Sequence, residues 1–173
     1  MSKAMEILMS EHKNILKVIE ALFEQGAKDE KTGMVSADFY RTAVDFIRNY
    51  ADKFHHAKEE DILFIELNKD SANLHCNPTE QMLYEHDLGR GHIKALEAGL
   101  KENNLAKVLA GARGYGNLLK DHIYKEDNIL YAMADEALAD KVKDDMLSKF
   151  EKIAAENSKI NKKYELFLNN LNK

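Results

Sequence analysis

The sequence contains very little cysteine, proline or tryptophan and has no long apolar run. It has one cysteine, Cys76, one proline and no tryptophan in 173 residues. One cysteine excludes an internal disulfide and argues against a metal site built from thiolates. No apolar run approaches the roughly 18 residues that a membrane span needs, and Met1 to Lys13 lack the apolar core and cleavage site of a signal peptide. We therefore expect a cytoplasmic protein without a membrane partner.

The chain also lacks a strong excess of charge of either sign. Its 25 basic and 30 acidic residues give a net charge of -5. This mildly acidic balance argues against nucleic acid and anionic membranes as main partners. With 45% hydrophobic residues over 173 positions, the chain can bury a substantial core, and we predict one domain over residues 1–173.

The scarcity of proline and the abundance of alanine, leucine, lysine and glutamate favour an all-α fold. Gly26 and Gly33 are interpreted as helix stops, Ser36 as the N-cap of the second helix and Asn77 as the N-cap of the third. The predicted helices cover about residues 3–25, 37–67, 78–100, 105–134 and 137–171. Short connections favour antiparallel neighbours. We therefore predict an up-down-up-down four-helix bundle over about residues 3–134, with an additional C-terminal helix over about residues 137–171.

Two stretches of the chain repeat each other without gaps. "HHAKEEDILF" at residues 55–64 aligns with "HIYKEDNILY" at residues 122–131, and both contain HxxKE followed by an apolar triplet. Upstream of each stretch lies a Glu-His pair, Glu11-His12 in one case and Glu85-His86 in the other. The chain therefore looks like two related helix pairs. In a bundle with approximate two-fold symmetry, the two Glu-His and two HxxKE elements would meet at one centre.

Helical phase places the histidines of these motifs among apolar side chains. Positions three, four and seven apart share a helix face, so His122 and Glu126 share a face with Leu119 and Ile129, and His12 and His86 lie on comparable faces. A single histidine in such a place is more often a hydrogen-bonded core residue. Four helices that each contribute one, two of them with a glutamate one turn later, indicate a shared site.

Buried carboxylates need a compensating cation. Lys58 and Lys125 precede the glutamates by one position, which turns them away from the site. A pair of metal ions held by imidazole and carboxylate would compensate the charge, and donors of this kind without thiolate suit iron, manganese or zinc. Such a dinuclear centre would leave coordination positions open for a small ligand.

Two overlapping donor pairs with the same spacing lie in "KFHHAKEEDILF". These are His55 with Glu59 and His56 with Glu60. The match to the second repeat selects His55 and Glu59. The phase of an α-helix agrees, because it places His56 and Glu60 nearly opposite the apolar face. We therefore predict that His56 and Glu60 are solvated neighbours of the site.

With these motifs the sequence resembles the hemerythrin-like proteins, also called HHE cation-binding domains. The resemblance covers about Met5 to Met133 and rests on "SEH", "FHHAKEEDILF", "YEHDLGR" and "DHIYKEDNILY". It implies a four-helix bundle with a non-haem di-iron centre: two iron ions, bridged by carboxylates and by an oxo or hydroxo group. It also implies a small ligand, either O2, peroxide or nitric oxide. The metal ligands that the resemblance implies are His12, His55, Glu59, His86, His122 and Glu126.

The chain departs from the oxygen-carrying members of this family at two positions. Those members have a second histidine one turn after the third-helix ligand and an aspartate as the second bridge. Here the corresponding residues are Arg90 and Glu126, which argues against reversible oxygen carriage. Arg90 is either a surface or helix-pairing residue or a residue that reaches an anionic ligand or a carboxylate behind the ligands.

Several other residues have weaker functional interpretations. Tyr115 is interpreted first as a core tyrosine and second as a hydrogen-bond donor to a metal-bound ligand. Glu11 and Glu85 are expected to be solvated rather than to orient ligands, and His92 is expected to be exposed. The pair His75-Cys76 is assigned to a loop. Close helix packing or a bend is expected at Gly111, Gly114 and Gly116.

Three classes of function fit these residues. The first is a di-iron oxidoreductase that scavenges small oxidants. The second is a non-enzymatic protein that carries or stores oxygen or iron, or senses it together with a separate partner. The third is a metal-free structural bundle. Fold and ligands are shared across such activities, so the sequence alone does not choose among them.

Overall fold

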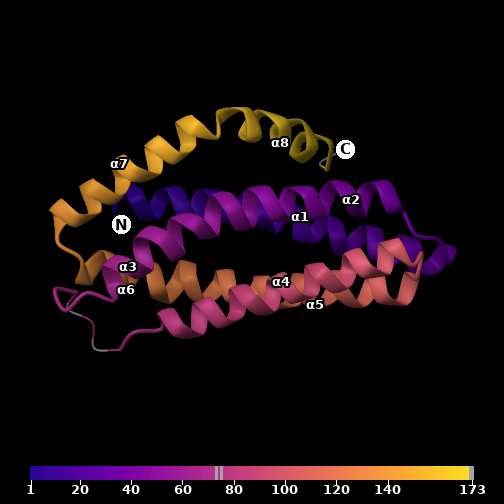
Figure 1. Ribbon diagram of the computed structural model, residues 1–173, viewed down its shortest axis with the longest axis horizontal. Helices are drawn as coiled ribbons and strands as arrows, with labels where there is room; N and C mark the ends of the chain where they lie inside the picture. Colours follow the sequence, from indigo (N-terminus) through magenta and orange to yellow (C-terminus); the bar gives the residue numbers. More distant parts are fainter. Residues whose placement is uncertain (73, 75, 172–173) are drawn as a thin grey trace.

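The computed structural model describes residues 1–72, 74 and 76–171, and every regular element in these ranges is helical. The all-α prediction is therefore confirmed. Before residue 140, the described helices form four long, nearly continuous segments, which we call rods. The rods lie side by side along the length of the molecule, and the C-terminal helices run along one side of them (Figure 1). The first rod is α1 (Lys3–Thr32) and the third is α4 (Thr79–Lys101). His75, which was assigned to a loop, lies outside the described residues.

The second and fourth rods change their winding where the repeated motif occurs. The second rod comprises α2 (Ala37–Phe46), two π-helical segments η1 (Ile47–His56) and η2 (Glu59–Leu63), and α3 (Phe64–Leu67). The fourth comprises α5 (Leu105–Lys125), the π-helical segment η3 (Glu126–Leu130) and α6 (Tyr131–Ala137). π-Helical turns are rare and occur frequently at functional sites.

The ends of the rods are close to those predicted, with one clear error in the first helix. Gly26 does not end α1, which continues to Thr32 and stops at Gly33, whose φ of 70° is left-handed. Ser36 does not cap the next helix through its own side chain; its backbone N–H and its hydroxyl donate to the buried carboxylate of Asp29. The N-cap of α4 is Pro78 and not Asn77, which lies one residue earlier; the Asn77 side-chain oxygen accepts a hydrogen bond from the Thr79 N–H at 3.0 Å.

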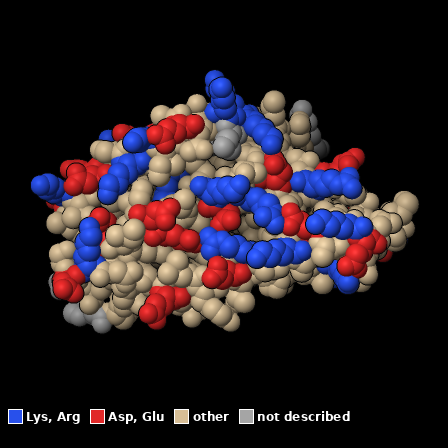
Figure 2. All heavy atoms as spheres, in the orientation of Figure 1, with Lys and Arg blue, Asp and Glu red and all other residues tan. Residues whose placement is uncertain are grey.

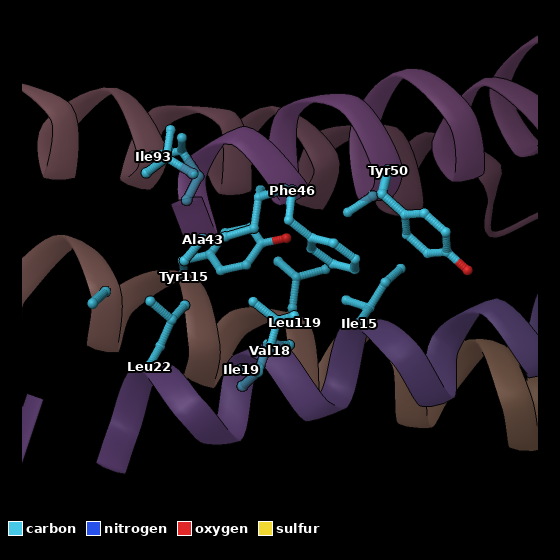
Figure 3. Close-up of a cluster of buried hydrophobic side chains, with 14 of the residues drawn as sticks. Ile15, Val18, Ile19, Leu22, Ala43, Phe46, Tyr50, Ile93, Tyr115 and Leu119 are labelled. Carbon is cyan, nitrogen blue, oxygen red and sulfur yellow. The ribbon is translucent and has the colours of Figure 1, made fainter. Parts of the chain in front are cut away.

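Two apolar clusters fill the interior of the bundle. The first contains Ile15, Leu22, Phe46, Tyr115 and Leu119, and Figure 3 shows their side chains meeting between the rods. The second contains residues from the opposite parts of the same rods, namely Met5, Leu8, Leu63, Met82 and Leu130. On each rod, a histidine of the predicted site lies between the residues of the first cluster and those of the second. The two clusters therefore enclose a polar layer.

The C-terminal arm consists of two helices instead of the single one predicted. They are α7 (Asp140–Glu156) and α8 (Ser158–Leu171), separated at Asn157. Met146 and Phe150 of α7 enter the second cluster, while Tyr164 and Leu168 of α8 enter the first. The arm thereby covers both apolar clusters from outside the four rods.

Small residues allow α4 and α5 to approach closely. A Cβ atom at Gly111 would lie 2.7 Å from the backbone nitrogen of Leu96, and one at Gly114 would collide with the ring of His92. Close packing at these glycines is therefore confirmed. His92 is half-buried in this contact instead of fully exposed.

The surface of the molecule carries charged side chains of both signs. On the face in Figure 2, basic and acidic side chains are interspersed. Exposed ion pairs such as Arg113 with Glu30 are of a kind that contributes little to stability. Within the described residues, no helix is both long enough and apolar enough to span a membrane.

Candidate metal centre

Four histidines from the four rods converge between the apolar clusters. His12 of α1 and His55 of η1 form one pair, with ring centroids 4.5 Å apart and planes at 61°. His86 of α4 and His122 of α5 form a second pair of nearly the same geometry, at 4.7 Å and 66°. Each of the four is 1% exposed. The predicted histidines thus come together as two matching pairs.

Two fully buried glutamates lie between these pairs. Glu126 places Oε1 3.2 Å from His122 Nε2 and Oε2 3.3 Å from His12 Nε2. Glu59 places Oε2 3.5 Å from His55 Nε2 and 3.6 Å from His86 Nε2. Each carboxylate therefore faces one histidine of each pair, which is the position that a bridging ligand requires.

Several polar atoms of this cluster have no hydrogen-bond partner in the described structure. They are Nε2 of His55, Oε2 of Glu59 and both carboxylate oxygens of Glu126. Buried polar atoms are nearly always paired, and a group left unpaired costs about 1–3 kcal/mol. Convergent unpaired nitrogen and oxygen atoms are the donor set of a cation site, and His12, His55, Glu59 and Glu126 lie close enough to surround one ion. The residues present therefore fit a bound metal.

The two glutamates differ in their electrostatic environment. Burial, together with the charge of Glu126, raises the pKa of Glu59 well above its usual value. Burial would also raise the pKa of Glu126, but His122 and His12 hold it well below the usual value. The same carboxylates act on His12: burial alone would lower its pKa, whereas Asp127 and Glu126 raise it to about 9. The centre thus attracts positive charge most strongly beside Glu126.

The outward-facing nitrogen of each of these histidines meets a carboxylate. Because an ionised carboxylate only accepts, the Nδ1–H donates, and in the neutral ring Nε2 keeps its lone pair for the centre. Metal-ligating histidines commonly have this arrangement, which fixes the tautomer and orients the ring. The Nδ1-to-oxygen distances are 2.8 Å for His12 and Asp127, 3.0 Å for His55 and Glu11, 2.7 Å for His86 and Glu60, and 2.8 Å for His122 and Glu85.

Glu11 and Glu85 are buried, so the expectation that they are solvated is wrong. Besides the hydrogen bond from a histidine, each of these two glutamates accepts one from the lysine three residues after that histidine. Lys58 Nζ lies 2.7 Å from Glu11 Oε1, and Lys125 donates to Glu85. Lys58 is completely buried. The lysines do point away from the central glutamates, as predicted, but they neutralise the carboxylates behind the histidines.

The prediction that His56 is solvated is also wrong. His56 is 5% exposed, its ring stacks on that of His86 at 3.8 Å and 10°, and its Nδ1 lies 3.6 Å from Asp52. The π-helical winding of η1 is the reason. A π-helix turns less per residue than an α-helix, so His55 and His56 both face inward. Glu60 is partly exposed and binds His86 and Arg90.

His56, His86 and His122 also lie close enough together to form a second donor group. A ring nitrogen binds a metal with a lone pair that lies in the plane of the ring. Two rings stacked in parallel at 3.8 Å cannot both contain the same ion in their planes. We therefore keep His86 and His122 as the second pair and place His56 beside them.

A small pocket opens next to this second pair. Its volume is about 110 Å³, which is room for several water-sized groups. Arg90 lies at the pocket and donates to Asp52 at 2.9 Å and to Glu60 at 2.6 Å, so it reaches carboxylates behind the histidines. Tyr115 is a core residue whose buried hydroxyl has no partner among the described residues. The pocket is lined by Ile47, Arg48, Asp52, His56, His86, Gly89, Arg90, Ile93, Lys94 and Tyr115.

Sequence reasoning missed Tyr131, which it counted as part of an apolar triplet. The Tyr131 hydroxyl donates to Glu59 Oε1 at 2.6 Å and lies 3.4 Å from His12 Nε2. The aligned residue in the first repeat is Phe64, so the hydroxyl is present in only one of the two repeats. That difference between the repeats is the signal that could have identified Tyr131.

The fold and the convergent donors define a helical-bundle protein with a cation-binding centre. The chain belongs to the hemerythrin HHE cation-binding domain family, whose model matches residues 3–134. This confirms the family suggested by the motifs. No curated protein and no solved structure matched the chain.

Proposed function

We propose that this protein holds two iron ions in a centre of four histidines and two glutamates. His12 and His55 hold one ion, His86 and His122 hold the other, and Glu59 and Glu126 bridge them, together with an oxo or hydroxo group. The observation that carries the proposal is the convergence of unpaired buried donors, among them both oxygens of Glu126. The proposal treats residues 1–173 as one domain, with an up-down-up-down bundle over about residues 3–134.

The spacing of the donor atoms supports this assignment. Donors that occupy adjacent positions on an ion, each about 2.0–2.2 Å from it, lie about 3 Å apart. The Nε2 atoms of His86 and His122 are 3.0 Å apart, and the contacts of Glu126 with His12 and His122 are 3.3 and 3.2 Å. Two ions would also offset the two central carboxylates, because Lys58 and Lys125 pair with Glu11 and Glu85 instead.

A small ligand fits this centre best. Each ion would have two imidazoles and two bridging carboxylates, which leaves positions for a bridging oxygen and for O2, peroxide or nitric oxide in the usual six-coordinate sphere of iron. Iron supplies the electron transfer that such oxidants require. The small pocket beside His86 offers space for molecules of this size and not for a large substrate. We propose a cytoplasmic protein that scavenges a small oxidant; a non-enzymatic carrier, store or sensor is the alternative.

Metal content and oxygen reactivity test the proposal together. Purified protein should contain two iron ions per chain, and the reduced protein should change its absorption spectrum on exposure to air. Turnover of hydrogen peroxide without a lasting adduct would support the scavenger. A stable, reversible adduct without turnover would support the carrier, and a fully helical protein that binds no metal would eliminate both.

The ligand assignment on the second rod has a separate test. His55→Ala should remove metal, because it removes an imidazole from one ion. His56→Ala should retain both ions, because the His56 ring stacks on His86 without sharing its plane. The reverse result would transfer the assignment to His56 and Glu60.

A further inference from the structure

One aromatic ring packs against each histidine pair at equivalent positions of the two repeats. The ring of Tyr131 stacks on His12, with centroids 5.6 Å apart and planes at 13°. The ring of Phe64 stacks on His86 at 6.0 Å and 21°. Both aromatic residues are almost completely buried. The two arrangements therefore match in position and orientation and differ in one hydroxyl group.

That hydroxyl lies among donor atoms of the proposed centre. The Tyr131 oxygen is 2.6 Å from Glu59 Oε1 and 3.4 Å from His12 Nε2. These separations bracket the roughly 3 Å expected between neighbouring donors on one ion. The His12 nitrogen involved is the one turned toward the centre, because its other nitrogen donates to Asp127. The phenol oxygen is thus placed like a further donor of the His12 and His55 pair.

We propose that Tyr131 is a metal ligand and binds, as phenolate, the ferric ion held by His12 and His55. The proposal rests on the dinuclear centre proposed above. An Fe–O bond forms, the phenol O–H bond breaks, the proton leaves to solvent, and iron keeps its oxidation state. Tyrosine oxygen is an established ligand of protein-bound iron. Phe64 offers no donor to the other ion, so the centre has one ion with a phenolate and one without.

A phenolate ligand gives a signature that other roles of Tyr131 do not. Ferric phenolates have a charge-transfer absorption in the visible range, and excitation in that band enhances the Raman modes of the tyrosine ring. A hydroxyl that only donates a hydrogen bond to Glu59 produces neither signal. The spectrum of the iron-loaded protein therefore separates a ligand from a hydrogen-bond donor.

The experiment uses the full chain loaded with iron and oxidised, as wild type, Tyr131→Phe and Tyr40→Phe. Tyr40 is a matched control, since it is also fully buried but lies in the first apolar cluster. We expect the phenolate band in the wild type and in Tyr40→Phe, and its complete loss in Tyr131→Phe while two irons remain bound. Phenylalanine already occupies the equivalent position 64, so the Tyr131→Phe protein should fold.

The outcomes distinguish this proposal from the one on which it rests. A wild-type protein without iron would remove the dinuclear centre and this proposal with it. A wild-type protein with two irons and no phenolate signal, or a band that survives in Tyr131→Phe, would overturn this proposal alone. Should Tyr131→Phe fail to fold, ring-deuterated tyrosine in the wild type decides: enhanced modes that do not shift on deuteration would overturn the proposal.

Discussion

The two helix pairs of this molecule agree in the histidines and glutamates that face the proposed centre and in the carboxylates behind the histidines, and they differ in neighbouring side chains. Glu11 accepts hydrogen bonds from His55 and Lys58, and in the same way Glu85 accepts from His122 and Lys125. The His12 and Asp127 contact has its counterpart in the contact of His86 with Glu60. The shared contacts are those that hold a metal ligand in place.

The differences fall outside this shared set. Tyr131 is replaced by Phe64, Ile123 by His56 and Leu16 by Arg90 when the repeats are aligned. His56 and Arg90 lie at the pocket beside the second histidine pair, whereas the Tyr131 hydroxyl lies beside the first. The two halves therefore present matching pairs of histidines but surround them with different side chains.

The largest expected effect tests whether the two halves are equivalent as metal positions. His55→Ala and His122→Ala each remove one imidazole, and because both ions share the bridging glutamates, each variant should weaken binding of both. Loss of a residue behind a ligand costs about 10–100-fold in metal affinity, so loss of a ligand should cost at least about 100-fold. Metal content after dialysis measures this, with His92→Ala as control. A variant that keeps two ions at wild-type affinity would contradict the equivalence.

The next largest effect is on stability, and it should differ between the two halves because Lys58 is buried and Lys125 is partly exposed. Glu11→Gln leaves Lys58 completely buried without its carboxylate, whereas Glu85→Gln leaves Lys125, which is 37% exposed, in reach of water. Removing one partner of a buried ion pair leaves an uncompensated charge and costs roughly 3–5 kcal/mol. Glu11→Gln should therefore destabilise the metal-free protein by about 3 kcal/mol, and Glu85→Gln by much less. Urea unfolding measures the difference. Addition of Lys58→Met to Glu11→Gln should recover stability, and equal losses for the two single variants would be evidence against the argument.

The sequence predicted the symmetric part of this site because the repeat itself identifies it. The ungapped match selected His55 and Glu59, and turn residues such as Asn77 located the helix ends. The prediction was wrong where it applied the period of an α-helix to a segment that is π-helical. His56 was placed on the outer face because an α-helix was assumed, and the π-helical winding of η1 turned it inward.

The remaining errors depend on contacts between rods that no local pattern contains. Glu11 is buried because His55 and Lys58 reach it from another helix. Tyr131 belongs to an apolar triplet by composition, and only its position beside His12 reveals the role of the hydroxyl. Gly26 was interpreted as a helix stop, but it lies within α1, where it faces Leu109 of another helix.

A smaller effect concerns the two central glutamates in the metal-free protein. Burial raises the pKa of Glu59, so its folded form is protonated well above the pH at which an unfolded glutamate ionises. Glutamine resembles that neutral carboxyl, so Glu59→Gln should change the free energy of unfolding by less than about 1 kcal/mol below the usual glutamate pKa and should leave the protein more stable than the wild type at neutral pH. Glu126 is held ionised by His122 and His12, so Glu126→Gln should cost about 1–3 kcal/mol.

The sign of the pH dependence provides a check on this assignment. A carboxyl whose pKa is higher in the folded than in the unfolded state contributes stability at low pH that is lost as the pH rises through the folded value. The wild type should therefore lose this contribution of Glu59 above the usual glutamate pKa, and Glu59→Gln should not. Thermal melts of both metal-free proteins across that range measure it. Parallel stability profiles would show that Glu59 is not the group concerned.

The smallest change adds a hydroxyl to the half that lacks one. Phe64→Tyr should place a phenol beside His86 as Tyr131 is placed beside His12, and Glu126 can accept its hydrogen bond because both of its oxygens lack a partner. The free energy of unfolding of the metal-free protein should change by only about 1 kcal/mol. In the ferric protein, the second phenolate should add to the visible charge-transfer band, and the double variant Phe64→Tyr with Tyr131→Phe should carry the band on the other ion. If Phe64→Tyr binds two irons and folds normally but leaves the band unchanged, the two aromatic positions are equivalent in packing and not in their access to the ions.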